Sequence, residues 1–146
     1  DLMGKLSNLE SVIGIKDATS EISRISEHNN LCNKEFIQLS GEDETIFDYM
    51  QNGGHGCISV TANIVPKFCS EMHKLFSLGD FEGAKKLNDN LMPLHKAIFI
   101  ETSPSPVKYI LGKMNLIDYE IRLPLVKIRT ETKEIIDRVI KDLEII

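Results

Sequence analysis

The chain has 146 residues, a formal net charge of −5 and an isoelectric point of about 5.4. Hydrophobic residues make up 42% and charged residues 27%, which are ordinary values for a soluble globular protein. No cluster of Lys and Arg stands out, and no apolar run approaches the roughly 18 residues that a transmembrane helix needs. The composition therefore disfavours nucleic acid and membranes as partners.

The front of the chain alternates between apolar runs and helical patterns. Strands are predicted over residues 11–18, 36–40 and 56–61, and helices over residues 2–9, 20–31, 42–50 and 63–78. Strand starts roughly 20–25 residues apart are typical of parallel β/α folds. The first strand is mostly apolar, so we expect both of its faces to be buried. A parallel sheet of three strands leaves two unpaired edges, which predicts further strands from more chain or from a partner.

The back of the chain is predicted to be helical. Asp80 is expected to cap a long helix in which Pro93 should cause a kink or an interruption. The segment Ser103–Pro106 predicts a break before a helix that runs to about residue 114. Thr130 is expected to cap the last helix.

The cysteines and histidines suggest neither disulfides nor zinc. Cys32, Cys57 and Cys69 are scattered and odd in number, which predicts three small buried side chains and a cytoplasmic protein. The four histidines form no HExxH motif and no Cys/His spacing typical of zinc sites.

Lys16 is the residue that points most clearly to chemistry, because it lies inside an otherwise apolar strand. In a β/α barrel it would lie near the carboxyl end of that strand, where active sites gather. A desolvated lysine favours the neutral amine, which can attack a ketone and form an imine. On the pattern alone, a strand-end lysine that reaches solvent is the commoner case.

Two glycine-containing turns have a functional and a structural interpretation. Ser40–Asp43 could face a substrate, although the pattern alone favours a plain turn with acidic residues at a helix N-terminus. Gly53–Gly56 is neither a Walker loop nor a dinucleotide-binding motif. It is expected to end a helix, with His55 in a structural role at the start of the next strand.

Taken together, the motifs resemble the dihydrodipicolinate synthase family over nearly the whole chain. The matching segments are Val12–Thr19, Leu39–Asp43, Gly53–Asn63, Leu91–His95, Glu101–Lys108 and Arg122–Leu125. The resemblance implies an α/β fold: the C-terminal part of a (β/α)8 TIM barrel, with its last three strands and their helices, followed by a helical region. It divides the chain into residues 1–79, the last three β/α units, and residues 80–146, the C-terminal helices.

The resemblance also implies a function and its residues. Lys16 matches the lysine that forms a Schiff base with pyruvate, and Ile58 matches the position whose backbone carbonyl lies beside pyruvate. Gly41 matches a turn near the substrate. The implied reaction joins pyruvate to L-aspartate 4-semialdehyde in lysine and diaminopimelate biosynthesis, with no cofactor and no metal. The implied partners are further copies, as a dimer or tetramer, and an N-terminal half-barrel that has no counterpart here, so the chain alone is expected to be a poor catalyst.

Three alternatives stay open at this point. A related pyruvate-dependent aldolase, of the N-acetylneuraminate lyase or keto-sugar-acid type, would share the same lysine. A half-barrel that has lost catalysis could serve binding or assembly. A nucleotide-binding module would need a glycine-rich loop after a strand, whereas Gly53 and Gly54 precede one.

Overall fold

The computed structural model describes residues 2–146 and divides the chain into two compact units, Asp1–Ser59 and Val60–Ile146. Each unit has its own buried core. Helix α4 packs closely on α5, which places α4 with the helices that follow it. The division at residues 79 and 80, drawn from the resemblance, describes barrel units rather than these packing units and stays a prediction.

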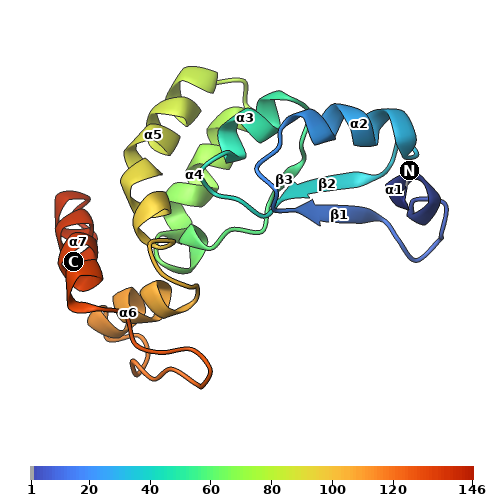
Figure 1. The fold of residues 1–146 in the computed structure, drawn as a ribbon. Helices are drawn as coiled ribbons and strands as arrows, with labels where there is room; N and C mark the ends of the chain where they lie inside the picture. The colour runs from blue at the N-terminus through green and yellow to red at the C-terminus, as the bar shows by residue number, and fades with distance from the viewer. Residues whose placement is uncertain (1) are drawn as a thin grey trace. The chain divides into compact units, whose positions relative to one another are not determined.

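The first unit is a three-stranded parallel sheet with its helices, in the order β1-β2-β3 (Figure 1). Its elements are α1 (Leu2–Leu6), β1 (Gly14–Asp17), α2 (Ser23–Leu31), β2 (Ile37–Ser40), α3 (Ile46–Gln51) and β3 (Gly56–Cys57). The predicted alternation of strands and helices is therefore confirmed. Every strand is shorter than its apolar run, because the ladder extends only as far as neighbouring strands run side by side.

The third strand shows how pairing limits the length of a strand. Residues 56–61 were predicted to be extended, but β3 ends at Cys57. The N–H of Ile58 donates to the carbonyl of Ser40, at 2.9 Å. Ser40 is the last residue of β2, so the chain beyond Ile58 has no ladder partner and turns into a short 3-10 helix, η1 (Thr61–Asn63).

One face of the sheet is covered and the other is open. The register pairs Asp17 with Ser40 and Lys16 with Leu39. Asp17 and Ser40 are buried, whereas Lys16 is exposed and Leu39 is half-buried. Since successive side chains of a strand point to opposite faces, the prediction that both faces of the first strand are buried is wrong for the described chain.

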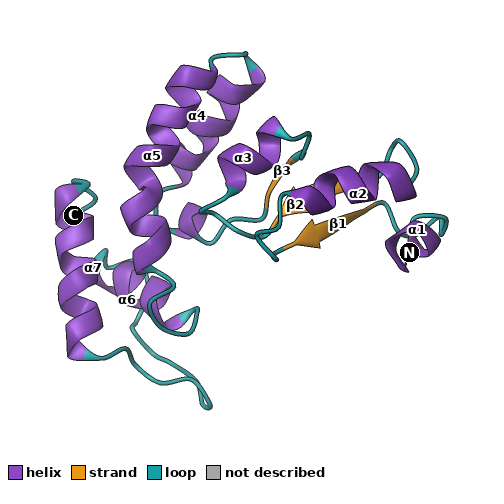
Figure 2. Ribbon diagram, turned by 45° about the horizontal axis from the view of Figure 1, so that its top comes forward, coloured by secondary structure: helices purple, strands orange, loops and turns teal. Residues whose placement is uncertain are grey.

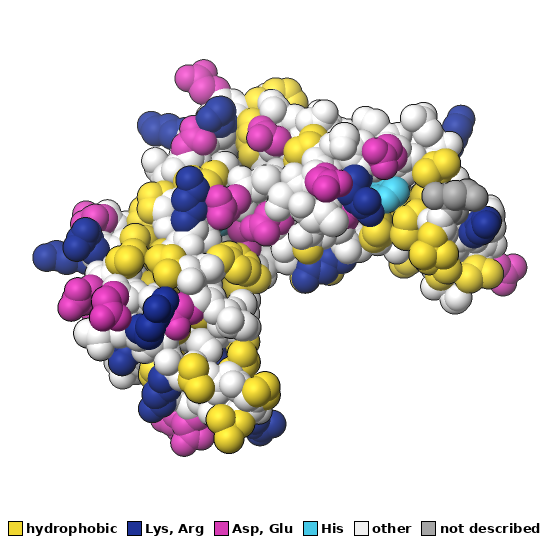
Figure 3. Space-filling view, viewed as in Figure 1, with side chains coloured by type: hydrophobic (Ala, Val, Ile, Leu, Met, Phe, Trp, Pro, Cys, Tyr) yellow, Lys and Arg dark blue, Asp and Glu magenta, His cyan; other side chains and the backbone are white. Residues whose placement is uncertain are grey.

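The segment before β1 carries exposed apolar side chains. Ile13 is 71% exposed, and Leu2 and Leu9, at the α1 end of the unit, are also more than half exposed. Figure 3 shows hydrophobic surface over this end of the unit. Apolar surface of this kind favours a covering partner.

The second unit consists of helices around one apolar core (Figure 2). Its helices are α4 (Pro66–Ser77), α5 (Phe81–Ala97), α6 (Ser105–Lys113) and α7 (Thr130–Asp142). Ile98, Ile110 and Ile136 are fully buried at its centre. None of the helices described between residues 2 and 146 is long and apolar enough to cross a membrane.

Asp80 starts α5 as predicted, and Pro93 does not interrupt this helix. Asp80 caps α5 by accepting from the Gly83 N–H at 2.9 Å. Pro93 does not interrupt α5, which is continuous from Phe81 to Ala97. Pro93 lies on the exposed side of the helix, where water can satisfy the carbonyl that loses its helical partner.

Thr130 is the first residue of α7 and not its cap. Arg129 occupies the cap position, and its side chain makes no capping hydrogen bond. Instead, the Arg129 N–H donates to Glu101 Oε1 at 3.0 Å, so a carboxylate from elsewhere in the sequence satisfies the helix start.

The three cysteines are free thiols. Cys69 is buried as predicted, whereas Cys32 and Cys57 are only half-buried. The prediction of three buried side chains therefore holds for Cys69 alone.

Candidate active site

Lys16 lies one residue before the carboxyl end of β1, on the open face of the sheet. The strands are parallel, so the carboxyl ends of β1 and β2 form one edge. Gly41 follows β2 directly, and Ile58 follows β3 directly. The side chains of Lys16 and Ile58 are exposed, as expected for groups that could meet a ligand.

The register places the three predicted site residues together. Leu39 pairs with Lys16 on one side and with Gly56 on the other. Ile58 lies two residues beyond Gly56, and pleating returns it to the same face. Lys16, Gly41 and Ile58 therefore gather at one edge of the open face.

Gly41 lies against the stem of Lys16. A Cβ at position 41 would lie 2.6 Å from Lys16 Cε and 2.7 Å from the Cβ of Ala18. Real Cβ atoms essentially never come that close, so only glycine fits here while Lys16 keeps its direction. The structure thus explains on steric grounds why position 41 is glycine, which the sequence pattern did not.

Asp17, next to Lys16, points to the covered face and is 7% exposed. Its Oδ2 accepts from Arg24 Nε at 2.6 Å, and its Oδ1 accepts from the N–H and hydroxyl of Thr19. Burial of the Asp17 carboxyl opposes its ionisation, but the hydrogen bonds from Arg24 and Thr19 outweigh burial and lower the pKa of Asp17. Asp17 therefore stays a carboxylate at neutral pH.

A second carboxylate lies at the same edge. Asp43, in the turn after β2, is 2% exposed and accepts a short hydrogen bond from the Ser59 hydroxyl. The sequence interpretation treated Asp43 as an acid in a helix first turn, but α3 begins only at Ile46. The contact links the chain after β2 to the chain after β3, and no local pattern signals it.

Tyr49 of α3 packs against Gly54, just before β3. Its hydroxyl is buried and finds no hydrogen-bond partner within the described residues. Burial raises the pKa of Tyr49, and the charge of Asp17 adds to the effect while that of Arg24 reduces it. Tyr49 is therefore a neutral phenol at ordinary pH.

The opposite end of the sheet holds His55. Its Nδ1 accepts from the Gln38 N–H at 3.1 Å, and Gly53 adopts a positive φ of 98° where α3 ends. These contacts agree with the prediction that His55 and the glycines are structural.

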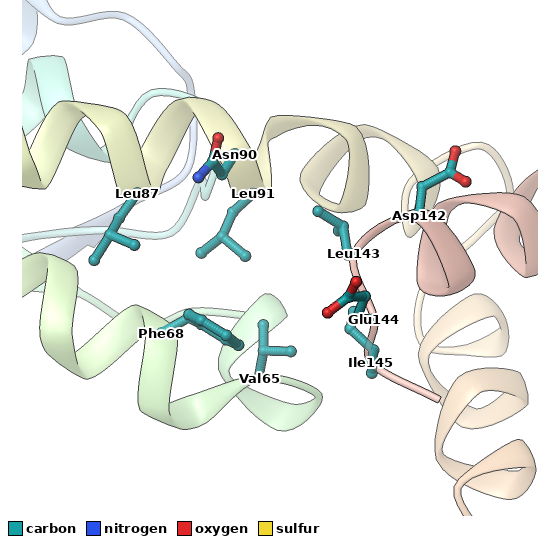
Figure 4. A pocket seen from close by; sticks show the side chains of 9 residues that line it. All are labelled: Val65, Phe68, Leu87, Asn90, Leu91, Asp142, Leu143, Glu144 and Ile145. Atoms are coloured by element: carbon teal, nitrogen blue, oxygen red, sulfur yellow. The ribbon is translucent and has the colours of Figure 1, made fainter.

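The second unit has a cavity of its own, of about 370 Å³ (Figure 4). It is lined by Val65, Phe68, Leu87, Asn90, Leu91, Asp142, Leu143, Glu144 and Ile145. None of these is a predicted site residue. In the stretch from residue 2 to residue 146, no three His, Cys, Asp or Glu side chains gather closely enough to hold a metal ion.

A parallel β/α sheet with a lysine near the carboxyl end of a strand fits part of a β/α barrel, in which active sites gather at that end. The family model of the dihydrodipicolinate synthetase family matches residues 1–143. The chain belongs to this family.

Relatives of similar sequence carry the same enzyme name. The chain is 47% identical over 130 residues to the 4-hydroxy-tetrahydrodipicolinate synthase of Bartonella bacilliformis, covering 89% of this chain and 44% of that protein. It is 46% identical over 142 residues to the synthase of Brucella abortus, covering 97% of this chain and 48% of the relative. The chain therefore spans about half the length of the curated relatives that it matches.

Solved structures agree with the fold. Dihydrodipicolinate synthase from Thermotoga maritima matches with a TM-score of 0.94 and 34% identity, over 99% of this chain and 50% of the other. The chloride-inhibited dihydrodipicolinate synthase from Acinetobacter baumannii, complexed with pyruvate, matches with a TM-score of 0.92 and 39% identity, also over 99% and 50%.

Proposed function

We propose that this chain carries the catalytic lysine of a 4-hydroxy-tetrahydrodipicolinate synthase, a lyase that condenses pyruvate with L-aspartate 4-semialdehyde. The observation that carries the proposal is the position of Lys16, on the open face of β1 beside Gly41 and Ile58. Family membership and the pyruvate-bound relative support the choice of pyruvate as first substrate.

In the proposed reaction, the neutral amine of Lys16 attacks the ketone carbon of pyruvate, and water leaves to give an imine. The protonated imine withdraws electrons, so the methyl group of pyruvate loses a proton and an enamine forms. The enamine carbon attacks the aldehyde of the second substrate. The amino group of that substrate then displaces Lys16 as the ring closes, which regenerates the free amine.

Ile58 and Gly41 are assigned supporting roles. The N–H of Ile58 donates to Ser40, which fixes the backbone at this point, and we assign its carbonyl to a contact with pyruvate. The Gly41 turn lets the backbone approach the substrate closely, because it carries no side chain.

The open face requires a covering partner for catalysis. Lys16 is exposed, so the described residues leave its amine open to water. We propose that a further half-barrel, on a longer gene product or on a separate chain, covers this face, and that the assembled barrel forms dimers or tetramers. Without it the chain should be a poor catalyst, since preorganised donors supply much of the rate enhancement.

Trapping of the imine tests the proposal. The chain, in the longest form that its gene encodes, is incubated with pyruvate and borohydride, which reduces an imine to a stable amine. Peptide mass spectrometry should locate the adduct on Lys16, and Lys16→Ala should abolish it. Lys34→Ala, which removes another exposed lysine of the same unit, should label as the wild type does. An unlabelled Lys16 in the complete gene product with its partners would refute the assignment.

A further inference from the structure

We infer that Asp17 is a positioning residue for Lys16: held by Arg24 and Thr19, it fixes the end of β1 and, through Gly41, the direction of the lysine stem. The inference rests on the proposed function of Lys16. Asp17 itself points to the opposite face of the sheet and does not touch substrate.

Three hydrogen bonds hold the carboxylate of Asp17 in place. Asp17 accepts from Arg24 Nε at 2.6 Å, from the Thr19 hydroxyl at 2.7 Å and from the Thr19 N–H at 2.9 Å. The Asp17 side chain is only 5% exposed, and hydrogen bonds between ionised groups are short and strong. These bonds leave the strand end little freedom, because they tie it to the turn at Thr19 and to the first turn of α2.

The backbone of Asp17 is also linked to Gly41. The carbonyl of Asp17 accepts from the Gly41 N–H at 2.7 Å, so the position of Asp17 sets the position of Gly41. Gly41 lies between the side chains of Lys16 and Ala18, with no room for a Cβ. A shift of the strand end therefore moves the surface on which the stem of Lys16 lies.

The direction of the Lys16 side chain affects the reactivity of its amine. Imine formation requires the amine to approach the ketone along a narrow direction, and a displacement of about 1 Å can cost roughly a hundredfold in rate. Reactive groups keep such a geometry when the residues behind them are locked. The ion pair on the covered face supplies this lock for Lys16, whose side chain is exposed on the open face.

Asp17→Asn tests the inference. Asparagine keeps the shape and an acceptor for Thr19, but it presents a neutral amide to Arg24. At saturating pyruvate, the rate of borohydride trapping at Lys16 should fall about tenfold, while the pyruvate concentration for half-maximal rate changes by less than about twofold. Asp17→Glu, which restores the charge, should recover a good part of the rate.

Asp89→Asn is the matched control. Asp89 makes an ion pair of the same length with Lys85, at 2.6 Å, but both side chains are more than half exposed. This variant should trap pyruvate at the wild-type rate. Each rate is divided by the folded fraction, measured by circular dichroism on the same sample, so that loss of structure is not counted as loss of positioning.

The labelling results distinguish the proposed function of Lys16 from the positioning role of Asp17. Absence of label on wild-type Lys16 would overturn the proposed function and the inference together. Normal labelling in the wild type and an equal corrected rate in Asp17→Asn would overturn the inference alone. If Asp17→Asn does not fold, Thr19→Val keeps the ion pair and removes one bond to the carboxylate; a slower corrected rate supports the positioning role, and a wild-type rate overturns it.

Discussion

The hydroxyl of Thr61 lies 2.7 Å from Nδ1 of His95, a hydrogen bond between two buried side chains in the apolar core of the second unit. Thr61 belongs to η1 and His95 to α5. Both residues lie in segments by which the chain resembles its family, but their spacing of 34 residues gives no sign that they meet.

Thr61→Val should destabilise the second unit by about 1–3 kcal/mol, because the isosteric change leaves a buried imidazole nitrogen without this partner. Urea unfolding, with the midpoint and slope compared with the wild type, measures the loss. Thr102→Val, at an exposed threonine, is the control and should be nearly neutral. Equal stability of Thr61→Val and the wild type would show that this bond contributes little.

Gly41→Ala should both destabilise the first unit and slow imine trapping. The new methyl group would collide with Lys16 Cε and Ala18 Cβ, and overpacking of this kind costs about 1–3 kcal/mol. Gly56→Ala is a suitable control, since its Cβ would meet only Leu39 Cδ2 at an ordinary 3.5 Å. A Gly41→Ala variant that traps pyruvate as fast as Gly56→Ala would contradict the steric role of Gly41.

Asp17 should make stability depend on pH in the acid range. Its pKa is lowered in the folded chain despite burial, by Arg24 and Thr19, so its contribution is present above the pKa of an unfolded Asp, about 4. That contribution is lost as the pH falls through the lower folded pKa. The free energies of unfolding of the wild type and Asp17→Asn should therefore differ near neutrality and converge on acidification.

Urea unfolding at stepwise lower pH, down to about pH 3, measures this convergence. Glu101 also has a lowered pKa, through its hydrogen bonds to Thr132 and Arg129. It is unchanged in both proteins, so its effect cancels in the difference. Two curves that stay parallel throughout would show that Asp17 does not titrate differently on folding.

Tyr109 should titrate at unusually high pH. Burial, and then the hydrogen bond that its hydroxyl donates to Asp137 at 2.9 Å, raise the pKa of Tyr109 to about 12. Because the folded state keeps a proton that the unfolded state loses near pH 10, stability should fall as the pH rises from about 10 to about 12.

Ultraviolet absorbance of phenolate measures the titration, and Tyr109→Phe assigns the step. The variant should lack the highest of the tyrosine transitions and should lose stability less steeply between those pH values. A wild-type Tyr109 that ionises together with an unfolded tyrosine would contradict the prediction.

Local patterns in the sequence predicted the elements well. Apolar runs located all three strands, and Asp80 marked the start of α5, because a cap bonds only to residues within its own turn. These patterns failed where a residue distant in the sequence determines where a helix or strand begins or ends. Arg129, not Thr130, is the cap position of α7, and Glu101 accepts from its N–H. Likewise, β3 stops where β2 has no further residue to pair with.

The sequence by itself determined the alternation of strands and helices and the family, and it predicted Lys16 as the residue for imine chemistry. The tertiary structure decided which face of β1 is open, why position 41 must be glycine, and that Asp17 is held by Arg24 and Thr19 behind Lys16. Periodicity and capping depend on residues a few positions apart, whereas these relationships depend on strand register and on contacts between elements, which no local spacing encodes.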